Sequence, residues 1–153
     1  MEILKIRKAK PSDEATVVKC IKKSYQKYIV RIGKKPGPML DYYLPLIMDG
    51  NVFCGEFCRE IVGVLVLKKF ADYMLLDNVA ILPEFQGKGF GKQLIAFAEQ
   101  YSSENNYHEI WLYTNIKMTE NIKLYHKLGY SEYTHKVENG FERVYFKKRL
   151  VST

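Results

Sequence analysis

Cysteine is scarce in this chain, and a long apolar run is missing. The 153 residues include three cysteines, Cys20, Cys54 and Cys58. An odd number of cysteines, in a chain without a leading signal-like segment, favours reduced thiols over a disulfide framework. Cys54 and Cys58 have no histidine pair at a zinc-finger spacing, so we expect no metal site. No apolar stretch reaches the ~18 residues of a membrane span, so we expect no membrane segment and a cytoplasmic protein.

Acidic residues are scarce in the N-terminal part. Residues 1–35 contain 11 Lys and Arg against 3 Asp and Glu, whereas residues 36–153 contain 13 against 14. The formal charge of +7 therefore comes from the first part of the chain. Such a region attracts an acidic acceptor, a nucleic acid or an anionic cofactor, and it is equally compatible with a solvated lysine-rich helix face.

Hydrophobic periodicity and turn residues predict a single domain over residues 1–153, with no repeat or linker. Ser12 is the expected N-cap of the first helix, and Pro45 predicts that the second helix is short or kinked. Asn139-Gly140 predicts a tight hairpin between the last two strands. The expected strands are 3–9, 51–58, 60–69, 73–82, 109–114, 130–136 and 141–148, and the expected helices are 12–28, 39–48, 89–103 and 119–127.

A glycine-rich turn follows the strand that ends at Pro83. Gly87, Gly89 and Gly91 let the backbone approach a ligand closely, and a helix that starts there directs its first N–H groups at that ligand. The positive end of the helix dipole favours a phosphate or pyrophosphate. A Walker A loop is excluded, because only three residues separate Gly87 from Gly91. A dinucleotide fingerprint is excluded, because Lys92 stands where it needs glycine.

Two motifs and the order of elements carry a family resemblance. Gln86-x-x-Gly89-x-Gly91 resembles the coenzyme A pyrophosphate loop of the GNAT acetyltransferases. Residues 121–130 are similar to that family's late helix, which ends in a Leu-Tyr-x-x-Leu-Gly-aromatic motif. The resemblance covers essentially the whole chain and implies an α/β (α+β) fold, in which about four helices flank a mixed, mostly antiparallel sheet of six or seven strands.

The resemblance implies acetyl transfer from acetyl-CoA to a primary amine by direct attack in a ternary complex, without a metal. Backbone amides of the glycine loop would hold the pyrophosphate. The strand before the loop would pair with the pantetheine arm, and one of its amides would polarise the thioester carbonyl. The implied cofactor-binding residues are Val79, Ala80, Ile81, Gln86, Gly87, Lys88, Gly89, Phe90, Gly91, Lys92 and Asn121.

One catalytic residue is implied by the same resemblance, and a second is inferred from strand alternation, which puts Asp77 on the same face as Val79 and Ile81. Tyr125 matches the tyrosine that protonates the departing thiolate, and the alternative is an aromatic residue of the core. Asp77 is the first candidate for the general base, because Tyr113 occupies the position where some relatives carry a glutamate; the alternative is a structural carboxylate. Asp41 is a second candidate. Met118 replaces an asparagine of many relatives, which puts one cofactor contact in doubt.

Acceptor specificity would depend on the first two helices and the loop between them. An aromatic and basic set there favours a small acceptor with an acidic group, such as an amino acid or a peptide end. The alternatives are acetylation of a protein N-terminus, a lysine or an aminoacyl-tRNA, and a regulator that binds acetyl-CoA without turnover. Dimers are common in the family, so a homodimer is a further expectation. The expected substrate-binding residues are Tyr25, Tyr28, Arg31 and Tyr42, with Lys34 and Tyr43 nearby.

Overall fold

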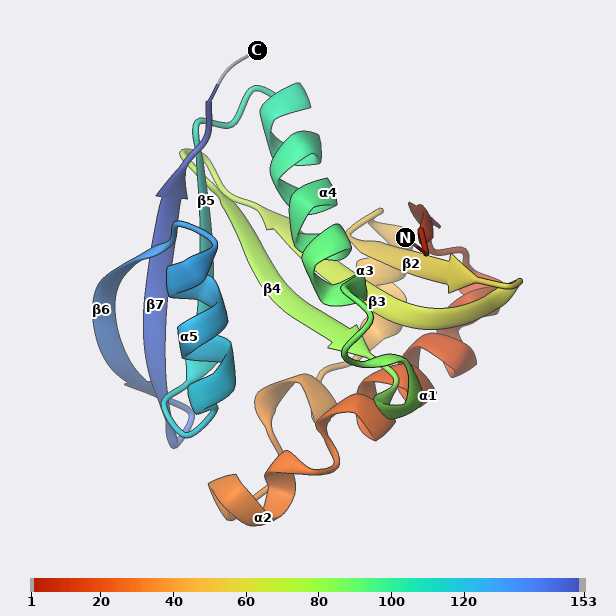
Figure 1. Ribbon diagram of the computed structural model, residues 1–153, viewed down its shortest axis with the longest axis horizontal. Coiled ribbons are helices and arrows are strands. Elements are labelled where there is room, and N and C mark those ends of the chain that lie inside the picture. Colours follow the sequence, from red (N-terminus) through yellow and green to blue (C-terminus); the bar gives the residue numbers. More distant parts are fainter. Residues whose placement is uncertain (1, 152–153) are drawn as a thin grey trace. The chain divides into compact units, whose positions relative to one another are not determined.

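The computed structural model describes residues 2–151, and within that range it has seven strands and five α-helices (Figure 1). One-turn 3-10 segments lie at Pro11–Asp13, Gly37–Met39 and Pro83–Phe85. The strands are β1 (Lys5–Lys8), β2 (Val52–Phe57), β3 (Glu60–Lys69), β4 (Met74–Ile81), β5 (Glu109–Asn115), β6 (Ser131–Glu138) and β7 (Phe141–Arg149). The helices are α1 (Glu14–Tyr25), α2 (Tyr28–Ile32), α3 (Tyr43–Met48), α4 (Phe90–Glu104) and α5 (Thr119–Lys127).

The strands form one mixed sheet in the order β1-β2-β3-β4-β5-β7-β6. The pairs β1–β2, β2–β3, β5–β7 and β6–β7 are antiparallel, and β4 pairs with β5 in parallel. The β6–β7 turn has Asn139 and Gly140 at φ 52° and 79°, as the Asn-Gly dipeptide predicts. The predicted fold class and sheet are therefore confirmed, with seven strands.

The helices near the N-terminus differ from the prediction. The first helix ends at Tyr25 rather than near Tyr28, because a tighter turn follows in which the Ile29 N–H donates to the Gln26 carbonyl. A separate helix α2 then replaces the start of the expected loop. Ser12 is not an N-cap, since it lies inside the 3-10 turn before α1. The Asp13 carboxylate instead accepts the Lys10 N–H at 2.7 Å.

The second helix is shorter than the expected 39–48. It starts at Tyr43, and the residues before it form the turn Gly37–Met39. Pro45 lies in the first turn of α3, where a backbone N–H has no partner within the helix, whereas a helix that began at residue 39 would require that N–H. The position of Pro45 thus outweighs the apolar spacing of residues 39–42.

The chain divides into two compact units, which we describe separately. The first contains the residues up to 67 and residues 78–98, and the second contains residues 68–77 and those from 99 onward. Strand β4 and helix α4 each contribute residues to both units. Among residues 2–151, no helix is both long and apolar enough to cross a membrane.

In the first unit, a pair of glycines lets α4 approach the sheet. Gly55 of β2 lies directly opposite Gly63 of β3. A Cβ atom at Gly63 would lie 2.8 Å from Ile81 Cδ1 and 3.1 Å from Leu94 Cδ1. A Cβ atom at Gly55 would lie 3.5 Å from Leu94 Cδ2. Leu94 therefore packs where two side chains are missing, and this packing fixes the height of α4 above the sheet.

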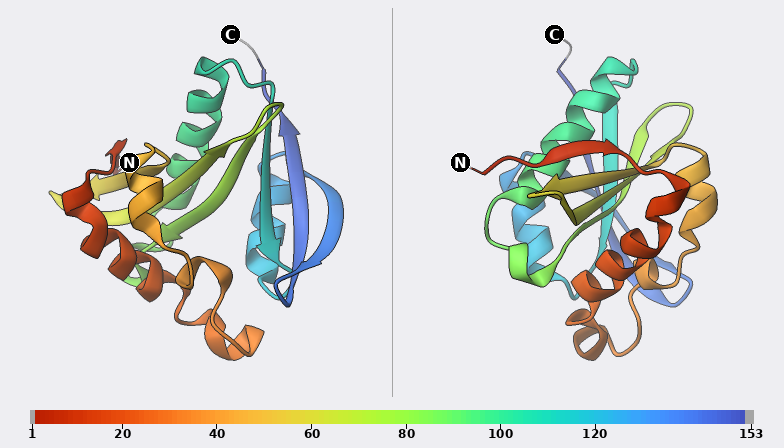
Figure 2. Two further views of the ribbon diagram at one scale, coloured as in Figure 1. Left: turned by 180° about the vertical axis from the view of Figure 1, so that it is seen from behind. Right: turned by 90° about the vertical axis from the view of Figure 1, so that its right-hand side faces the viewer.

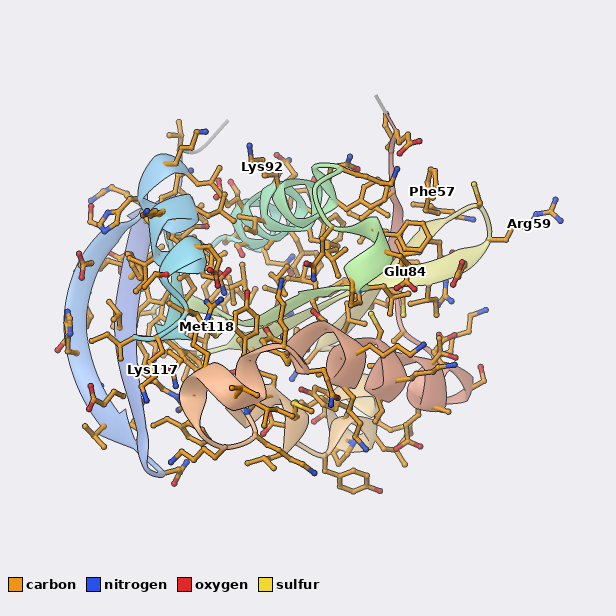
Figure 3. The ribbon with its side chains drawn as sticks, turned by 60° about the horizontal axis from the view of Figure 1, so that its bottom comes forward. Phe57, Arg59, Glu84, Lys92, Lys117 and Met118 are labelled. Atoms are coloured by element: carbon orange, nitrogen blue, oxygen red, sulfur yellow. The ribbon has the colours of Figure 1, made fainter. Side chains whose placement is uncertain are left out.

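The ends of α4 and β1 are fixed within the same unit. Phe90, the first residue of α4, is only 1% exposed and packs on Phe57 with ring centroids 5.2 Å apart. The Gln93 side chain accepts the Leu4 N–H and donates to the Glu2 carbonyl, each at 2.8 Å. Figure 2 shows the N-terminal strand beside the β2–β3 hairpin, and Figure 3 shows Arg59 at the tip of that hairpin.

In the second unit, α5 covers one face of β5 and β7 (Figure 1). Ile110, Leu112 and Thr114 of β5 are buried and alternate with half-buried Trp111 and Tyr113. Strand β7 alternates in the same way, with Val144 and Phe146 buried. The opposite face of this sheet carries Tyr113, Arg143, Tyr145 and Lys147.

We predict that Gly63→Ala destabilises the protein by about 1–3 kcal/mol, because the new methyl group overpacks the contact with Ile81 and Leu94. The measurement is the urea midpoint of unfolding against the unmodified protein. Gly91→Ala is the control, because a Cβ there meets no atom within 4 Å. That change should raise stability by about 0.5–1 kcal/mol, since alanine favours a helix. Equal midpoints for the two variants would contradict the packing argument.

Candidate anion-binding loop and catalytic residues

The glycine loop joins the end of β4 to the start of α4. Gly87 and Gly89 have φ of 82° and 83°, a left-handed conformation that side chains disfavour. The Gln93 N–H donates to the Gly89 carbonyl in the first bond of α4. Within residues 2–151, the N–H groups of the first turn of α4, those of residues 90–92, have no recorded partner. Four such groups are left over at the start of any helix, and they attract an anion.

The loop also leaves space for a ligand. A Cβ atom built at Gly87, Gly89 or Gly91 would meet no atom within 4 Å. Packing in the protein therefore does not explain these glycines. The left-handed backbone explains Gly87 and Gly89, and the open space at all three positions admits a ligand. The exposed residues Lys88 and Lys92 add positive charge. Figure 3 labels Lys92 on the first turn of α4. The Lys88–Glu2 ion pair at 3.6 Å is half exposed and contributes little. The residues present thus fit a pyrophosphate.

Gln86 braces the start of the loop. Its side-chain NH₂ donates to the Ile81 carbonyl at 3.0 Å, and its side-chain oxygen accepts from the Lys27 ammonium at 2.9 Å. Both ends of the amide are therefore used within the protein. A direct contact of Gln86 with the cofactor stays a prediction, and the structure supports a positioning role for it.

The second half of β4 contains the three residues expected to meet the pantetheine arm. Ala80 and Ile81 are buried, and Val79 is half buried. The Ile81 N–H donates to the Ser24 hydroxyl at 3.2 Å. The Val79 carbonyl lies 3.2 Å from the Tyr25 hydroxyl. Helix α1 therefore already satisfies part of this backbone, and pairing with a ligand would have to share or displace these contacts.

A buried network around Asn78 was missed by the sequence analysis. The Tyr25 hydroxyl donates to Asn78 Oδ1 at 2.6 Å, and Asn78 Nδ2 donates to the Tyr43 hydroxyl at 3.1 Å. Tyr43 in turn donates to the Pro38 carbonyl at 2.5 Å. This network fixes α1 and the segment before α3 to β4. The sequence does contain a signal for this network. Asn78 is a polar residue inside an otherwise apolar strand, and a buried amide requires hydrogen-bond partners.

The residues expected to bind the acceptor substrate differ in how exposed their side chains are. Tyr25 and Tyr28 are buried, with ring centroids 6.3 Å apart, whereas Tyr42 is 68% exposed. Arg31 is exposed, and its guanidinium carbon lies 5.1 Å from the centre of the Tyr28 ring. The structure therefore brings Tyr25, Tyr28 and Arg31 together, while Tyr42 lies on the surface before α3.

Tyr125 lies on α5 in the second unit and is 7% exposed. Its ring packs against Tyr130 and Phe146, with centroids 6.0 and 5.7 Å away. Among residues 2–151 its hydroxyl has no recorded partner, and no fully buried side-chain oxygen or nitrogen lacks one. The phenol oxygen therefore reaches the surface. Burial raises the pKa of Tyr125 to about 12, which keeps its proton in place at neutral pH.

Two neighbours of Tyr125 complete this part of the site. Asn121 lies one helical turn earlier and is half buried, so its amide shares a face with Tyr125. Met118 is 5% exposed and accepts a weak hydrogen bond from the Thr114 hydroxyl at 3.7 Å. The side chain that replaces the family's asparagine therefore fills the core.

Asp77 is 7% exposed, and both of its oxygens have partners. The Tyr113 hydroxyl donates to Oδ1 at 2.8 Å, and the Lys68 ammonium lies 3.5 Å from Oδ2. Tyr113, the residue at the family's glutamate position, is thus joined directly to the proposed substitute. The contacts are compatible with a base and with a structural carboxylate.

Within the described range, no group of three or more His, Cys, Asp or Glu is arranged to hold a metal ion.

A strand, a left-handed glycine turn and a helix start with unpartnered amides define an α/β protein with a site for an anionic ligand. Comparison with known families identifies the family to which this chain belongs. The chain belongs to the acetyltransferase (GNAT) family, whose model matches residues 24–130.

Two curated relatives are similar to parts of the chain. The spermidine N(1)-acetyltransferase of Vibrio cholerae is 32% identical over 83 residues, 54% of this chain and 46% of that protein. The [ribosomal protein bS18]-alanine N-acetyltransferase of Haemophilus influenzae is 33% identical over 75 residues, 48% of this chain and 50% of that protein. The matched stretches thus span about half the length of these relatives.

A solved structure extends the likeness to nearly the whole chain. The PaiA N-acetyltransferase of Thermoplasma acidophilum, in complex with coenzyme A, superposes with a TM-score of 0.78. The match covers 95% of this chain and 98% of that one at 18% identity. Such a likeness shows that the two chains share a fold.

We predict that stability falls above about pH 10 because tyrosines of the second unit resist ionisation when folded. Burial raises the pKa of Tyr125 to about 12; burial, and then Glu138, raise the pKa of Tyr145 to about 12. Burial and Glu99 also raise the pKa of Tyr130. An unfolded tyrosine ionises near pH 10, so the unfolded chain binds fewer protons than the folded one between about pH 10 and 12.

The measurement is the melting temperature as a function of pH. It should begin to fall at about pH 9, because burial also raises the pKa of Cys20 to about 12 and that of Cys54 to about 11, and it should fall more steeply above about pH 10. Tyr145→Phe should make this fall shallower, because it removes one titrating group. A profile that stays flat to about pH 11.5 would contradict the predicted pKa shifts.

Proposed function

We propose that this protein is an N-acetyltransferase that moves the acetyl group of acetyl-CoA to a primary amine. The observation that carries the proposal is the glycine loop at the start of α4, which combines unpartnered amides, positive charge and space that side chains would fill. Membership of the acetyltransferase family supports the reaction class. The coenzyme A in a structure of the same fold supports the cofactor.

Acetyl-CoA, the co-substrate, supplies an activated thioester. In this proposal, backbone amides from Gly87 to Lys92 hold its pyrophosphate, and Val79, Ala80 and Ile81 pair with the pantetheine arm. An amide of that strand would donate to the carbonyl oxygen as negative charge develops there. One such donor contributes about 3 kcal/mol to the transition state. Holding donor and acceptor together adds a large effective concentration.

Tyr125 is the proposed general acid. It is protonated at neutral pH because burial raises its pKa to about 12, and its oxygen reaches the surface. When the amine nitrogen bonds to the carbonyl carbon and the carbon–sulfur bond breaks, the phenol proton would pass to the departing sulfur.

Asp77 is the proposed general base, with Tyr113 as its hydrogen-bond partner. The amine proton would leave toward this pair, either directly or through water. Tyr113 lies on the sheet face opposite α5, whereas Tyr125 lies on α5 itself. Acid and base therefore belong to opposite faces of the second unit's sheet, as suits an attack on one side of the carbonyl and departure on the other.

The acceptor in this proposal is an amine of a small molecule, an amino acid or a peptide. The proposal also places the protein in the cytoplasm. The relatives' names mention spermidine and a ribosomal-protein alanine. Acetylation of a macromolecule is the second candidate, supported by the exposed lysines of α1, Lys19, Lys22 and Lys23. A homodimer and a nucleic-acid partner stay predictions.

We predict that Gly91→Glu abolishes binding of acetyl-CoA without unfolding the protein. A Cβ atom at position 91 would meet no atom within 4 Å, and a carboxylate in the first turn of a helix favours the helix. The same carboxylate would repel a pyrophosphate at the helix start. The measurement is calorimetric titration with acetyl-CoA, paired with a thermal melt.

Gly91→Gln is the matched control, because it has nearly the same shape and no charge. It should keep more affinity than the glutamate variant, by about tenfold or more. If the unmodified protein does not bind acetyl-CoA, the proposed function is wrong. If both variants bind as well as the unmodified protein, the cofactor lies elsewhere.

We predict that Tyr125→Phe lowers kcat by about 10²-fold or more, because general acid catalysis is lost. The dissociation constant for acetyl-CoA should change little, since only the hydroxyl is removed. Tyr130→Phe is the control: Tyr130 is also buried, and its hydroxyl donates to Glu99 at 2.8 Å. Equal loss of kcat in the two variants would contradict the acid role. The assay follows thiol release with the best amine from a panel of amino acids, their amides and spermidine.

A further inference from the structure

Two tyrosine–carboxylate pairs lie next to each other on the sheet face opposite α5. Tyr113 of β5 lies directly opposite Tyr145 of β7, with ring centroids 5.3 Å apart. The Tyr113 hydroxyl donates to Asp77, and the Tyr145 hydroxyl donates to Glu138. A phenol has one proton and two lone pairs. Because each proton is used, each phenol oxygen can act toward a further group only as an acceptor, and the Arg143 guanidinium already lies beside the Tyr145 oxygen. The remaining lone pairs suit the N–H groups of an amine.

Three cations surround these two pairs. The guanidinium carbon of Arg143 lies 4.5 Å from the centre of the Tyr113 ring. The Lys136 ammonium lies 5.0 Å from the centre of the Tyr145 ring. Lys68 pairs with Asp77 at 3.5 Å. With Glu142 of the adjoining cavity, three carboxylates balance these three cations, so the cluster has no excess of negative charge to favour a molecule with several positive charges.

Arg143 also connects the tyrosine pair to a small cavity. The cavity has a volume of about 130 Å³ and is lined by Ile116, His135, Lys136, Val137, Glu142 and Arg143. Lys136 and Arg143 are partners in the β6–β7 ladder, so adjacent strands each place a cation on its wall.

The guanidinium of Arg143 is held in place, but its contacts do not use all of its N–H donors. Its ion pair with Glu138 is 3.6 Å long, beyond the usual hydrogen-bond distance, and it also lies close enough to the Tyr145 hydroxyl to oppose the rise in the pKa of that phenol. Its side chain is 15% exposed and packs on the rings of Tyr113 and Phe141. A guanidinium carries five donors in a planar fork that matches a carboxylate. Arg143 is thus held in place with donors to spare for an anion.

We propose that this face of the second unit binds the acceptor as a free amino acid. The amine donates to the phenol oxygens of Tyr113 and Tyr145, and the carboxylate binds Arg143 and Lys136. This inference rests on the proposed function and narrows its substrate class to amines with a carboxylate on the adjacent carbon. It places the anion contact at Arg143 rather than at Arg31, where the sequence alone predicts it.

The first test compares matched acceptors with the unmodified protein. The panel contains the standard amino acids, their C-terminal amides and spermidine, each assayed by thiol release from acetyl-CoA. At least one amino acid should have a kcat/KM about tenfold or more above that of its amide and of spermidine. An amide or spermidine that reacts as well or better would overturn the inference, and this comparison needs no variant.

The second test removes the anion contact. Arg143→Gln should raise KM for the preferred amino acid about tenfold or more and leave KM for its amide unchanged. Arg143→Lys should restore part of the preference, since a point charge remains. Lys147→Gln is the matched control: it removes one cation from the same strand and face, where Lys147 lies 4.6 Å from the Tyr133 ring. It should leave the preference intact.

The outcomes separate this inference from the function on which it rests. If acetyl-CoA binds and amines react without regard to the carboxylate, only the amino-acid site is wrong. An equal loss for acid and amide in Arg143→Gln has the same meaning. If no amine in the panel is acetylated and acetyl-CoA does not bind, the proposed function fails, and the amino-acid site fails with it.

Discussion

The close approach of α4 to the sheet is the constraint on which the first unit depends. It requires two glycines opposite each other, Gly55 and Gly63, because any side chain there would occupy the place of Leu94. Once α4 is held at this height, its first turn and the glycine loop before it have a fixed position. Phe90 and Gln93 secure the same turn from other sides. A ligand site made of backbone amides is thus positioned by packing elsewhere.

The tyrosines of the second unit, which the proposed chemistry uses, are arranged by a different means. They differ in which side of the sheet they occupy and in what their hydroxyls contact. Tyr125 has a buried ring and an oxygen that reaches the surface, so it can give a proton away. Tyr113 and Tyr145 already give theirs to carboxylates. The same side chain therefore serves as donor in one place and as acceptor in another, and the neighbouring carboxylate decides which.

Sequence periodicity predicted the strands well, because apolar alternation and turn residues such as Asn139-Gly140 act locally. It predicted the glycine loop for the same reason. It failed where the chain makes non-local contacts. The break after Tyr25 accompanies the bond from that residue to Asn78, which lies 53 positions later. Likewise, the pairing of Tyr145 with Tyr113 depends on strand register, which no single stretch of sequence reveals.

The contacts of Gln93 also matter for how this protein is handled. Its side chain accepts from the Leu4 N–H and donates to the Glu2 carbonyl, so residues 2–4 lie against the opening turn of α4. A purification tag or fusion partner attached before Glu2 would lie next to that turn and to Lys88, which pairs with Glu2. Fusions at the other end of the chain avoid this contact, and affinities measured with them reflect the loop itself.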